Sequence, residues 1–426
     1  MLLADIDYLV TQNPDREILE DVDVLVRDGE IAAVGRDISA DGEVIDFSGK
    51  AVIPGLVNAH THAPMTLLRG ISDDKPLQDW LKEDIFPAEE KLDEEDAFVG
   101  ALLACSEMLK TGTTCFNEMY FHVDAVAKAV KTAGVRAVIG RGLTDIDGGK
   151  EEKMEQAQGF IERNLDSSLV TPSVAPHSVY TCSDELLVEA KQLAERYGLL
   201  YHIHVSETRR ENLEFRVEKG GPTPVQYLYR EGLLDGNTVL AHGTHLSGED
   251  RQRVAESGAG VAHNPAANLK LGSGVAGVAE MVEDGIGVGI GTDGAASNNS
   301  MNLFEEAKLA SLLQKERDPR KLPAQKVLDM LTIDGARMLG LAGEIGSIEP
   351  GKKADLVTVS LDRPGMTPRH GKKGLLSDLV FSFNGEVEDV LVDGRQVVRE
   401  GEILGLDTRK LSEMTQKKAE ELSPGQ

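Results

Sequence analysis

The stretch 51–62, AVIPGLVNAHTH, combines a Pro-Gly turn, a short apolar run and two histidines separated by one residue. The run 55–60 predicts a buried β-strand, because compact apolar runs bounded by turn residues are typical of parallel sheets. Alternate side chains of a strand point to the same face, so His60 and His62 are able to share one metal ion. The alternative is a pair of ordinary loop histidines. A metal site at the end of this strand is therefore the first prediction.

The same strand pattern recurs along the chain and alternates with helical patterns. Predicted helices such as 183–198 and 247–258 open on a capping residue and close on glycine. The eight predicted strands are 55–60, 113–119, 136–141, 168–177, 199–207, 238–243, 258–264 and 287–293. Eight such repeats over roughly 240 residues favour a (β/α)8 TIM-type barrel, an α/β fold, across residues 55–344.

Both ends of the chain have a different pattern of apolar and polar residues. Short alternating runs with Asp-Gly turns predict hairpins in residues 1–54 and again in residues 345–410. We expect these two pieces to pair into one small β-sandwich domain beside the barrel. Residues 411–426 predict a charged helical tail without recognisable chemistry.

The amino-acid composition limits the kinds of partner that the protein is expected to bind. The 426 residues include 72 acidic and 45 basic side chains, for a formal net charge of −27. This charge disfavours nucleic acid and anionic membrane surfaces as partners. The acidic residues are spread over the whole chain, which favours a salt-adapted, halophilic surface, with an acidic interaction face as the alternative. No stretch approaches the ~18–20 apolar residues of a membrane span.

The three cysteines and the first residues indicate the compartment. Cys105, Cys115 and Cys182 are odd in number and lack the spacing of a metal site. The opening residues, MLLADIDYLV, lack the basic region of a signal peptide. A reduced cytoplasmic setting is therefore expected.

Most histidines coincide with the predicted strand ends, where the catalytic groups of such barrels lie. Of the ten, only His122 and His370 fall elsewhere, and both are expected at the surface. The other eight are His60, His62, His177, His202, His204, His242, His245 and His263. His204, nearer its strand end, is preferred as the third metal ligand. His202 is the alternative ligand, or else a packed or supporting histidine.

Two carboxylates and one further histidine complete the predicted chemistry. Asp293, in GIGTDGAASNNS, is placed to bind the metal and to accept a proton from water. Glu207 is expected to carry protons between water and leaving group, a helix-cap carboxylate being the alternative. His242 is expected to orient or hydrogen-bond the attacking oxygen, and His245 to be a loop residue. Because a bound divalent metal lowers the pKa of water towards ~7, hydrolysis is the predicted reaction type.

The residues at the ends of strands one, five, six and eight resemble those of the amidohydrolase superfamily. They are, in chain order, His60, His62, His204, His242 and Asp293. The resemblance covers nearly the whole chain, including the closing segment GEIGSIEPGKKADLVTVSL. Some members bridge two metals with a carbamylated lysine on strand four, whereas this strand ends in His177. The resemblance therefore implies one divalent metal, expected to be zinc, with iron(II) as the alternative.

Several longer segments resemble the 5-methylthioadenosine/S-adenosylhomocysteine deaminases within that superfamily. They are HTHAPMTLLRGISDDKPLQDWLKEDIFPAEEKL, TTCFNEMY, APHSVYTCS, HVSET, HNPAANLKLGSG and GTDGAASNN. The resemblance implies hydrolytic deamination at adenine C6, which gives an inosine-type product and ammonia. It also implies a homo-oligomer, either a tetramer or a dimer.

The same resemblance implies which residues contact the substrate. They are Trp80 in a flap, Glu89 on the ribose hydroxyls, Arg141 at the far end of the 5′ substituent, and His177, Glu207 and Asp293 near the nucleoside. Plainer alternatives exist for three of them. Trp80 is otherwise a core or interface residue, Glu89 a solvated acid, and Arg141 the partner of a barrel carboxylate.

The chain departs from this family where members that accept S-adenosylhomocysteine carry a second arginine. The region reads GLTDIDGGKEEKMEQ and offers only Lys150 or Lys153. Arginine grips a carboxylate with two parallel hydrogen bonds, whereas lysine is a point charge. We therefore expect methylthioadenosine, 5′-deoxyadenosine or adenosine as substrates and leave S-adenosylhomocysteine in doubt.

Two other functions are consistent with parts of the pattern. An amidohydrolase acting on guanine or a chlorinated s-triazine would use the same metal but would need no ribose clamp at Glu89. A catalytically inactive barrel, kept as a binding or assembly protein, would not need to retain every candidate ligand together with Glu207.

Overall fold

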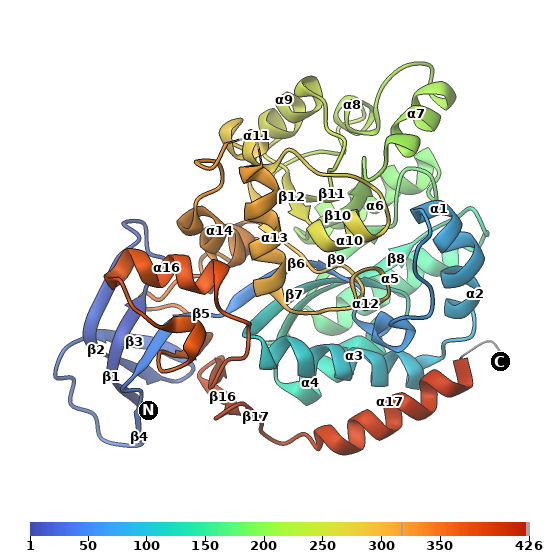
Figure 1. The fold of residues 1–426 in the computed structure, drawn as a ribbon. Coiled ribbons are helices and arrows are strands. Elements are labelled where there is room, and N and C mark those ends of the chain that lie inside the picture. The colour runs from blue at the N-terminus through green and yellow to red at the C-terminus, as the bar shows by residue number, and fades with distance from the viewer. Residues whose placement is uncertain (317, 423–426) are drawn as a thin grey trace.

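The eight predicted central strands are present in the computed structural model, which describes residues 1–316 and 318–422. They are β6 (Leu56–Thr61), β7 (Thr113–Tyr120), β8 (Arg136–Leu143), β9 (Val170–Pro176), β10 (Tyr201–Val205), β11 (Thr238–His242), β12 (Gly260–His263) and β13 (Val288–Ile290). Each strand is parallel to the next and hydrogen-bonds to it in chain order. The predicted barrel is confirmed and occupies the centre of Figure 1.

Polar contacts join the last strand of this sheet to the first. The Asp293 N–H donates to the His60 carbonyl oxygen at 3.0 Å. The Thr292 N–H donates to Asn58 Oδ1 at 3.0 Å, and Asn58 Nδ2 donates to Thr292 Oγ1 at 2.8 Å. These groups are buried, so each hydrogen bond replaces one lost to water. The ends of β6 and β13 are thereby held side by side.

Helices surround the barrel. They are α3 (Glu94–Lys110), α4 (Val123–Ala133), α5 (Lys150–Asn164), α6 (Asp184–Tyr197), α7 (Arg209–Glu218), α8 (Pro224–Arg230), α9 (Gly248–Ser257), α10 (Pro265–Lys270), α11 (Val278–Glu283), α12 (Ala295–Asn298), α13 (Leu303–Lys315), α14 (Ala324–Leu331) and α15 (Ile333–Met338). The capping signals act as predicted: the side chains of Asp93, Ser183 and Ser247 each accept an N–H from three residues ahead. Gly198 and Gly258 end their helices with positive φ.

Between β6 and α3 the chain forms a run of short helices. They are η1 (Ala63–Leu68), α1 (Leu77–Trp80), a π-helical turn η2 (Leu81–Ile85) and α2 (Phe86–Glu89). Asp73, in the loop before α1, lies 2.6 Å from Lys270 Nζ of α10. This segment therefore reaches across the end of the barrel to the β12 side.

Strands from both chain ends form a second sheet, at the left of Figure 1. They are β1 (Leu2–Val10), β2 (Ile18–Arg27), β3 (Glu30–Gly35), β4 (Val44–Asp46), β5 (Lys50–Pro54), β14 (Leu356–Ser360), β15 (Val390–Val392), β16 (Arg395–Arg399) and β17 (Glu402–Ile403). The order is β17-β16-β15-β14-β5-β1-β2-β3, with β4 pairing to β1. Antiparallel pairing of β5 with β14 joins the two chain ends.

A buried ion pair connects the second sheet to the bottom of the barrel. Arg136, the first residue of β8, lies 3.2 Å from Asp355, and both side chains are almost fully buried. The Gly55 N–H donates to the Asp355 carbonyl oxygen at 2.8 Å. The amino-terminal ends of the strands therefore face the second sheet, and their carboxyl ends remain free to form a site.

The remaining elements are η3 (Pro364–Met366), α16 (Gly371–Phe381) and the tail helix α17 (Thr408–Leu422). Helix α17 packs beside α3, where Lys418 Nζ lies 2.8 Å from Asp96 Oδ1 (Figure 1). Residues 423–426 of the predicted tail lie outside the described residues. Within the described ranges, no helix combines the length and apolarity needed to cross a membrane. The three cysteines are buried free thiols.

We predict that Gly291→Ala destabilises the protein, because the barrel seam has no room for a methyl group. A Cβ at this position would collide with Asn264 Oδ1 and would lie 2.8 Å from the His60 backbone. The expected loss is about 1–3 kcal/mol, measured by thermal or denaturant unfolding. Gly287→Ala, just before β13, is the control, because a Cβ there would have no other atom within 4 Å. Equal stability of the two variants would contradict this account of the seam.

Candidate active site

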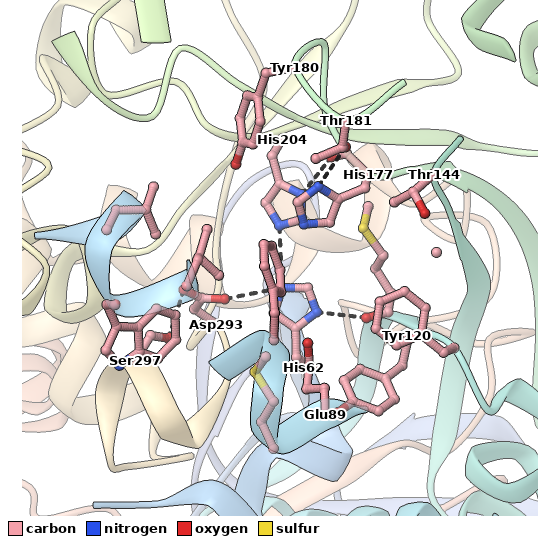
Figure 2. Close-up of a pocket in the computed structure, with 18 of the residues that line it drawn as sticks. His62, Glu89, Tyr120, Thr144, His177, Tyr180, Thr181, His204, Asp293 and Ser297 are labelled. Atoms are coloured by element: carbon pink, nitrogen blue, oxygen red, sulfur yellow. Dashed lines mark hydrogen bonds and ion pairs between the residues drawn. The ribbon is translucent and has the colours of Figure 1, made fainter. Parts of the chain in front are cut away.

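Four predicted metal ligands meet at the carboxyl ends of β6, β10 and β13. Nε2 of His62 lies 3.2 Å from Nε2 of His204. Oδ1 of Asp293 lies 3.4 Å from Nε2 of both His60 and His62. Figure 2 shows His62, His204 and Asp293 pointing towards one another. These ligand atoms come from strands that are far apart in the sequence, and only closure of the barrel brings them together.

The other ring nitrogens of these histidines determine which atom is free for a metal. Nδ1 of His62 lies 2.6 Å from the Met119 carbonyl oxygen, and Nδ1 of His204 lies 2.7 Å from the His177 carbonyl oxygen. A carbonyl oxygen only accepts, so each Nδ1 carries the proton and each Nε2 presents a lone pair. His60 Nε2 is buried and has no hydrogen-bond partner among the described residues. Three imidazoles and one carboxylate arranged in this way fit a zinc-type ion.

Burial keeps the histidines neutral, as metal binding requires. It lowers the pKa of His60 to about 3, and also lowers the pKa of His62 and, strongly, that of His204. Asp293 behaves in the opposite way. Burial alone would raise its pKa, but the contacts with His60, His242 and His62 hold the pKa below the usual range. Asp293 is therefore ionised at neutral pH.

Asp293 is held in one orientation. Its φ is +60°, which is uncommon outside glycine, and Ser297 Oγ donates to Oδ2 at 2.8 Å. Oδ1 is then the oxygen left to face the histidines. Sequence reasoning did not select Ser297. The signal was present, because Ser297 follows Asp293 by four residues on the short helix α12, within the motif GTDGAASNN.

His202 supports His60 and does not join the ligand cluster. Its Nε2 lies 3.0 Å from His60 Nδ1, and Asn117 Nδ2 lies 3.2 Å from its Nδ1. The structure therefore places His204, and not His202, with the other ligand atoms. His202 fixes the direction of the His60 ring from behind.

Glu207 and His242 lie next to the ligand cluster. His242 Nε2 lies 3.7 Å from Glu207 Oε2, and Ser273 Oγ donates to Glu207 Oε1 at 3.2 Å. Burial raises the pKa of Glu207. Burial also opposes the charged form of His242, but Glu207 and Asp293 raise its pKa overall. A raised carboxyl pKa favours a proton donor in this position.

The orientation of His242 depends on a residue that the sequence analysis did not select. His242 Nδ1 lies 2.8 Å from Asn268 Oδ1, so Nε2 faces Glu207 and the ligand cluster. Asn268 and Ser273 both belong to the segment HNPAANLKLGSG. The signal in the sequence was their place in this segment, which begins at the end of the predicted strand 258–264.

A cavity of about 480 Å³ opens beside the ligand cluster. This volume is in the range of small-molecule sites. The predicted substrate residues that line it are Trp80, Glu89, Arg141, His177, Glu207 and Asp293. The structure thus brings together all the residues expected to contact substrate, while their individual roles remain predictions.

Two of these residues present unpartnered polar atoms. Glu89 Oε1 and Trp80 Nε1 are buried and have no hydrogen-bond partner among the described residues. Burial raises the pKa of Glu89 to about 7. Tyr120, which was not predicted, also lines the cavity, and its buried hydroxyl likewise lacks a partner. Glu89 and Tyr120 are both labelled in Figure 2, below and beside the ligand cluster.

Two cationic residues that line the cavity already have polar partners. Arg141 donates through Nε to Gln156 at 2.9 Å and through Nη1 to the Gly142 carbonyl at 2.8 Å. Lys153 also lines the cavity, and its Nζ lies 2.6 Å from Asp147 Oδ1. Lys150 is not a lining residue, because it pairs with Glu185 and Glu189.

His122, His245 and His370 lie outside the ligand cluster. His370 is exposed, whereas His122 is half-buried, lines the cavity and lies 3.2 Å from the Leu92 carbonyl oxygen. His122 is therefore only partly at the surface, because its ring contacts Leu92, which lies between α2 and α3. His245 lies in the loop after β11 and contacts the Ser273 carbonyl oxygen.

Known proteins resemble this chain over almost its whole length. A model of the amidohydrolase family matches residues 51–397. The 5′-deoxyadenosine deaminase of Methanocaldococcus jannaschii is 41% identical over 94% of this chain and 95% of its own. The 5-methylthioadenosine/S-adenosylhomocysteine deaminase of Thermodesulfovibrio yellowstonii is 42% identical, over 95% and 94%.

Two solved structures have a similar fold. An adenosine deaminase from Xanthomonas campestris with bound zinc has a TM-score of 0.95 at 35% identity and covers 99% of this chain and 98% of its own. An atrazine chlorohydrolase from Arthrobacter aurescens, complexed with zinc, has a TM-score of 0.92 at 25% identity, with coverage of 98% and 99%.

We predict that His202→Ala weakens metal binding, because the His60 ring loses the partner that orients it. The expected loss is about 10- to 100-fold in affinity, measured by competition with a chromogenic chelator. His60→Ala should abolish stoichiometric binding, whereas His370→Ala, at an exposed position, should bind like the wild type. If His202→Ala bound the metal as tightly as the wild type, His202 would have no such supporting role.

Proposed function

The chain belongs to the amidohydrolase family, and on that premise we propose that it is a metal-dependent deaminase of adenosine-type nucleosides. The products are the inosine-type nucleoside and ammonia. One observation carries the proposal: a single cavity joins the His-Asp ligand cluster to Glu89, whose Oε1 atom is buried and has no hydrogen-bond partner among the described residues. The ligand cluster suits hydrolysis at a ring carbon, and the Glu89 carboxyl suits hydrogen bonding to a pair of ribose hydroxyls.

The proposed chemistry assigns a separate task to each group. His60, His62, His204 and Asp293 would hold a divalent ion, which we propose to be zinc, and the bound ion would supply an activated water molecule. Asp293 is ionised and accepts a proton. Burial raises the pKa of Glu207, which favours it as the group that donates a proton to the ring nitrogen and then assists the departure of ammonia. His242 stabilises the attacking oxygen through Nε2, because Asn268 engages Nδ1.

The far end of the cavity favours a small, uncharged 5′ substituent. Arg141 already donates to Gln156 and Gly142, and Lys153 already pairs with Asp147. The carboxylate of an amino-acid tail would have to displace Lys153 from Asp147 and Thr144, or else use only the N–H groups of Arg141 that Gln156 and Gly142 leave free. We therefore propose methylthioadenosine, 5′-deoxyadenosine and adenosine as better substrates than S-adenosylhomocysteine.

A second candidate is hydrolysis of guanine or a chlorinated s-triazine. The similarity to the atrazine chlorohydrolase favours it, since that fold also surrounds zinc. Glu89 weighs against it, because neither ring carries hydroxyls for that carboxyl. Assembly into a dimer or tetramer, a salt-adapted surface and a cytoplasmic location also remain proposals. The free thiols of the three cysteines support the last of these.

Ammonia release from a panel of substrates tests the proposal. Methylthioadenosine, 5′-deoxyadenosine and adenosine should be deaminated, S-adenosylhomocysteine less efficiently, and guanine and a chlorinated triazine not at all. Glu207→Gln should lower kcat by about 10²- to 10⁴-fold, since the proton donor is lost. Glu218→Gln, on the exposed face of α7, is the control. Turnover of only guanine or the triazine, or full activity of Asp293→Asn, would contradict the proposal.

A pH profile tests the role of Glu89. Because its pKa is raised to about 7, its carboxylate predominates only above that pH. If the carboxylate accepts the ribose hydroxyls, KM for adenosine should fall as pH rises through about 7. Glu89→Gln should raise KM by about 10- to 100-fold and remove this dependence, in line with the ~1.5–3 kcal/mol of a charged hydrogen bond. Glu94→Gln, at an exposed position that does not line the cavity, should leave the profile unchanged.

2′,3′-Dideoxyadenosine provides the matching substrate control, because it lacks both hydroxyls. The pH dependence of its KM should be the same in the wild type and in Glu89→Gln. A KM for adenosine that stayed flat across this range would leave Glu89 without a role in ribose binding.

A further inference from the structure

Glu211 is a buried carboxyl that the proposed chemistry leaves without a task. It lies in the first turn of α7 and is 5% exposed. Oε1 accepts the Ser206 N–H at 2.7 Å, and Oε2 accepts the Glu207 N–H at 2.8 Å. Among the described residues no ion pair of Glu211 with a lysine or arginine is found. A buried carboxyl is costly unless hydrogen bonds compensate it, and here both oxygens are used on two successive amides.

These hydrogen bonds differ from those of an ordinary helix cap. Thr208 is the N-cap of α7, and its Oγ1 already accepts the Glu211 N–H at 3.0 Å. In a capping box the third helical residue bonds back to the N-cap N–H. Glu211 reaches beyond the N-cap, to the two residues that connect β10 to the helix. Its target is therefore the connecting turn that carries Glu207.

The connecting turn has an unfavourable backbone conformation. Ser206 has a φ of +53°, in the left-handed region that side chains other than glycine seldom adopt. Such conformations persist only where the surroundings impose them. The bidentate contact with Glu211 supplies that restraint, because both N–H groups point at the same carboxylate. The turn in this conformation directs the next residue, Glu207, into the cavity.

Glu207 is then held from two sides. Ser273 Oγ restrains Oε1 at 3.2 Å, which leaves Oε2 facing His242 at 3.7 Å. Ser273 restrains only the tip of the side chain, whereas Glu211 restrains its backbone. Proton transfer requires the donor within hydrogen-bond reach of the ring nitrogen, so a shift of the backbone would misplace it.

We propose that Glu211 is a positioning residue that holds the Ser206–Glu207 turn and so aims the Glu207 carboxyl at the substrate. The inference rests on the proposed function, because it concerns the proton donor of that reaction. The reaction then requires a second carboxyl, that of Glu211, which lies behind Glu207 and does not itself react.

The test compares Glu211→Gln with Glu218→Gln, which makes the same chemical change on the exposed side of the same helix. In Glu211→Gln the side-chain amide replaces one acceptor oxygen with an NH2 group. This donor then faces a backbone N–H, which is itself a donor. We expect kcat to fall by about 10- to 100-fold, as for a ~1 Å misplacement of a catalytic group. KM should change less than kcat, and the metal content should stay at the wild-type level. Glu218→Gln should match the wild type in all three measurements.

A second variant separates positioning from general loss of stability. Ser206→Gly combined with Glu211→Gln should recover part of the lost kcat, because glycine adopts positive φ without strain. A purely structural role for Glu211 would lower the melting temperature and leave kcat of the folded enzyme unchanged. Glu211→Asp, which keeps the carboxyl group but is shorter, replaces Glu211→Gln if that variant does not fold, and it should also lower kcat.

Hydrogen–deuterium exchange of the peptide that contains residues 206 and 207 gives a readout independent of activity. These amides should exchange faster in Glu211→Gln than in the wild type or Glu218→Gln. If the wild type deaminates no nucleoside, the proposed function fails, and faster exchange still supports the positioning role. Unchanged exchange together with unchanged kcat in Glu211→Gln would overturn the inference.

Discussion

The 3.0 Å hydrogen bond from the Asp293 N–H to the His60 carbonyl oxygen is the contact on which the candidate site depends. It joins the last barrel strand to the first, and it does so at the two residues whose side chains belong to the ligand cluster. Asn58 and Thr292 add two more hydrogen bonds to the same seam. Gly291 allows the close approach, because a Cβ there would collide with the His60 backbone. Barrel closure and assembly of the ligand cluster are therefore one physical event.

The cavity separates its carboxyl groups by environment. Asp293 faces histidines and has a lowered pKa, whereas burial raises the pKa of Glu207. Two acids of similar chemistry are thus suited to opposite tasks, one as a proton acceptor and one as a proton donor. The histidine ligands are kept neutral by burial, and carbonyl oxygens accept from Nδ1 of His62 and His204. Backbone carbonyls, which no substitution removes, therefore set which ring nitrogen of these two histidines carries the proton.

Residues behind the reactive groups share a common function. Ser297 holds Asp293, His202 holds His60, Asn268 holds His242, and Ser273 holds Glu207. Each contact leaves one defined atom of its partner facing the cavity. A site built in this way has little freedom to reorganise, which is the condition for efficient electrostatic and proton-transfer catalysis.

The eight strands, their order and the chemical character of their ends could be predicted from the amino-acid sequence alone. These features depend on apolar runs, capping residues and turns, which act between near neighbours in the chain. His60, His62, His204 and Asp293 could also be recognised as a set, because few residues other than metal ligands produce that pattern at strand ends.

Other features emerged only from the folded chain: His202 supports His60, Lys153 and not Lys150 reaches the cavity, and His122 lines the cavity. The same holds for the contacts of Ser297 and Asn268. These roles depend on the direction of side chains across elements that come together only when the barrel closes, and no local pattern encodes that direction.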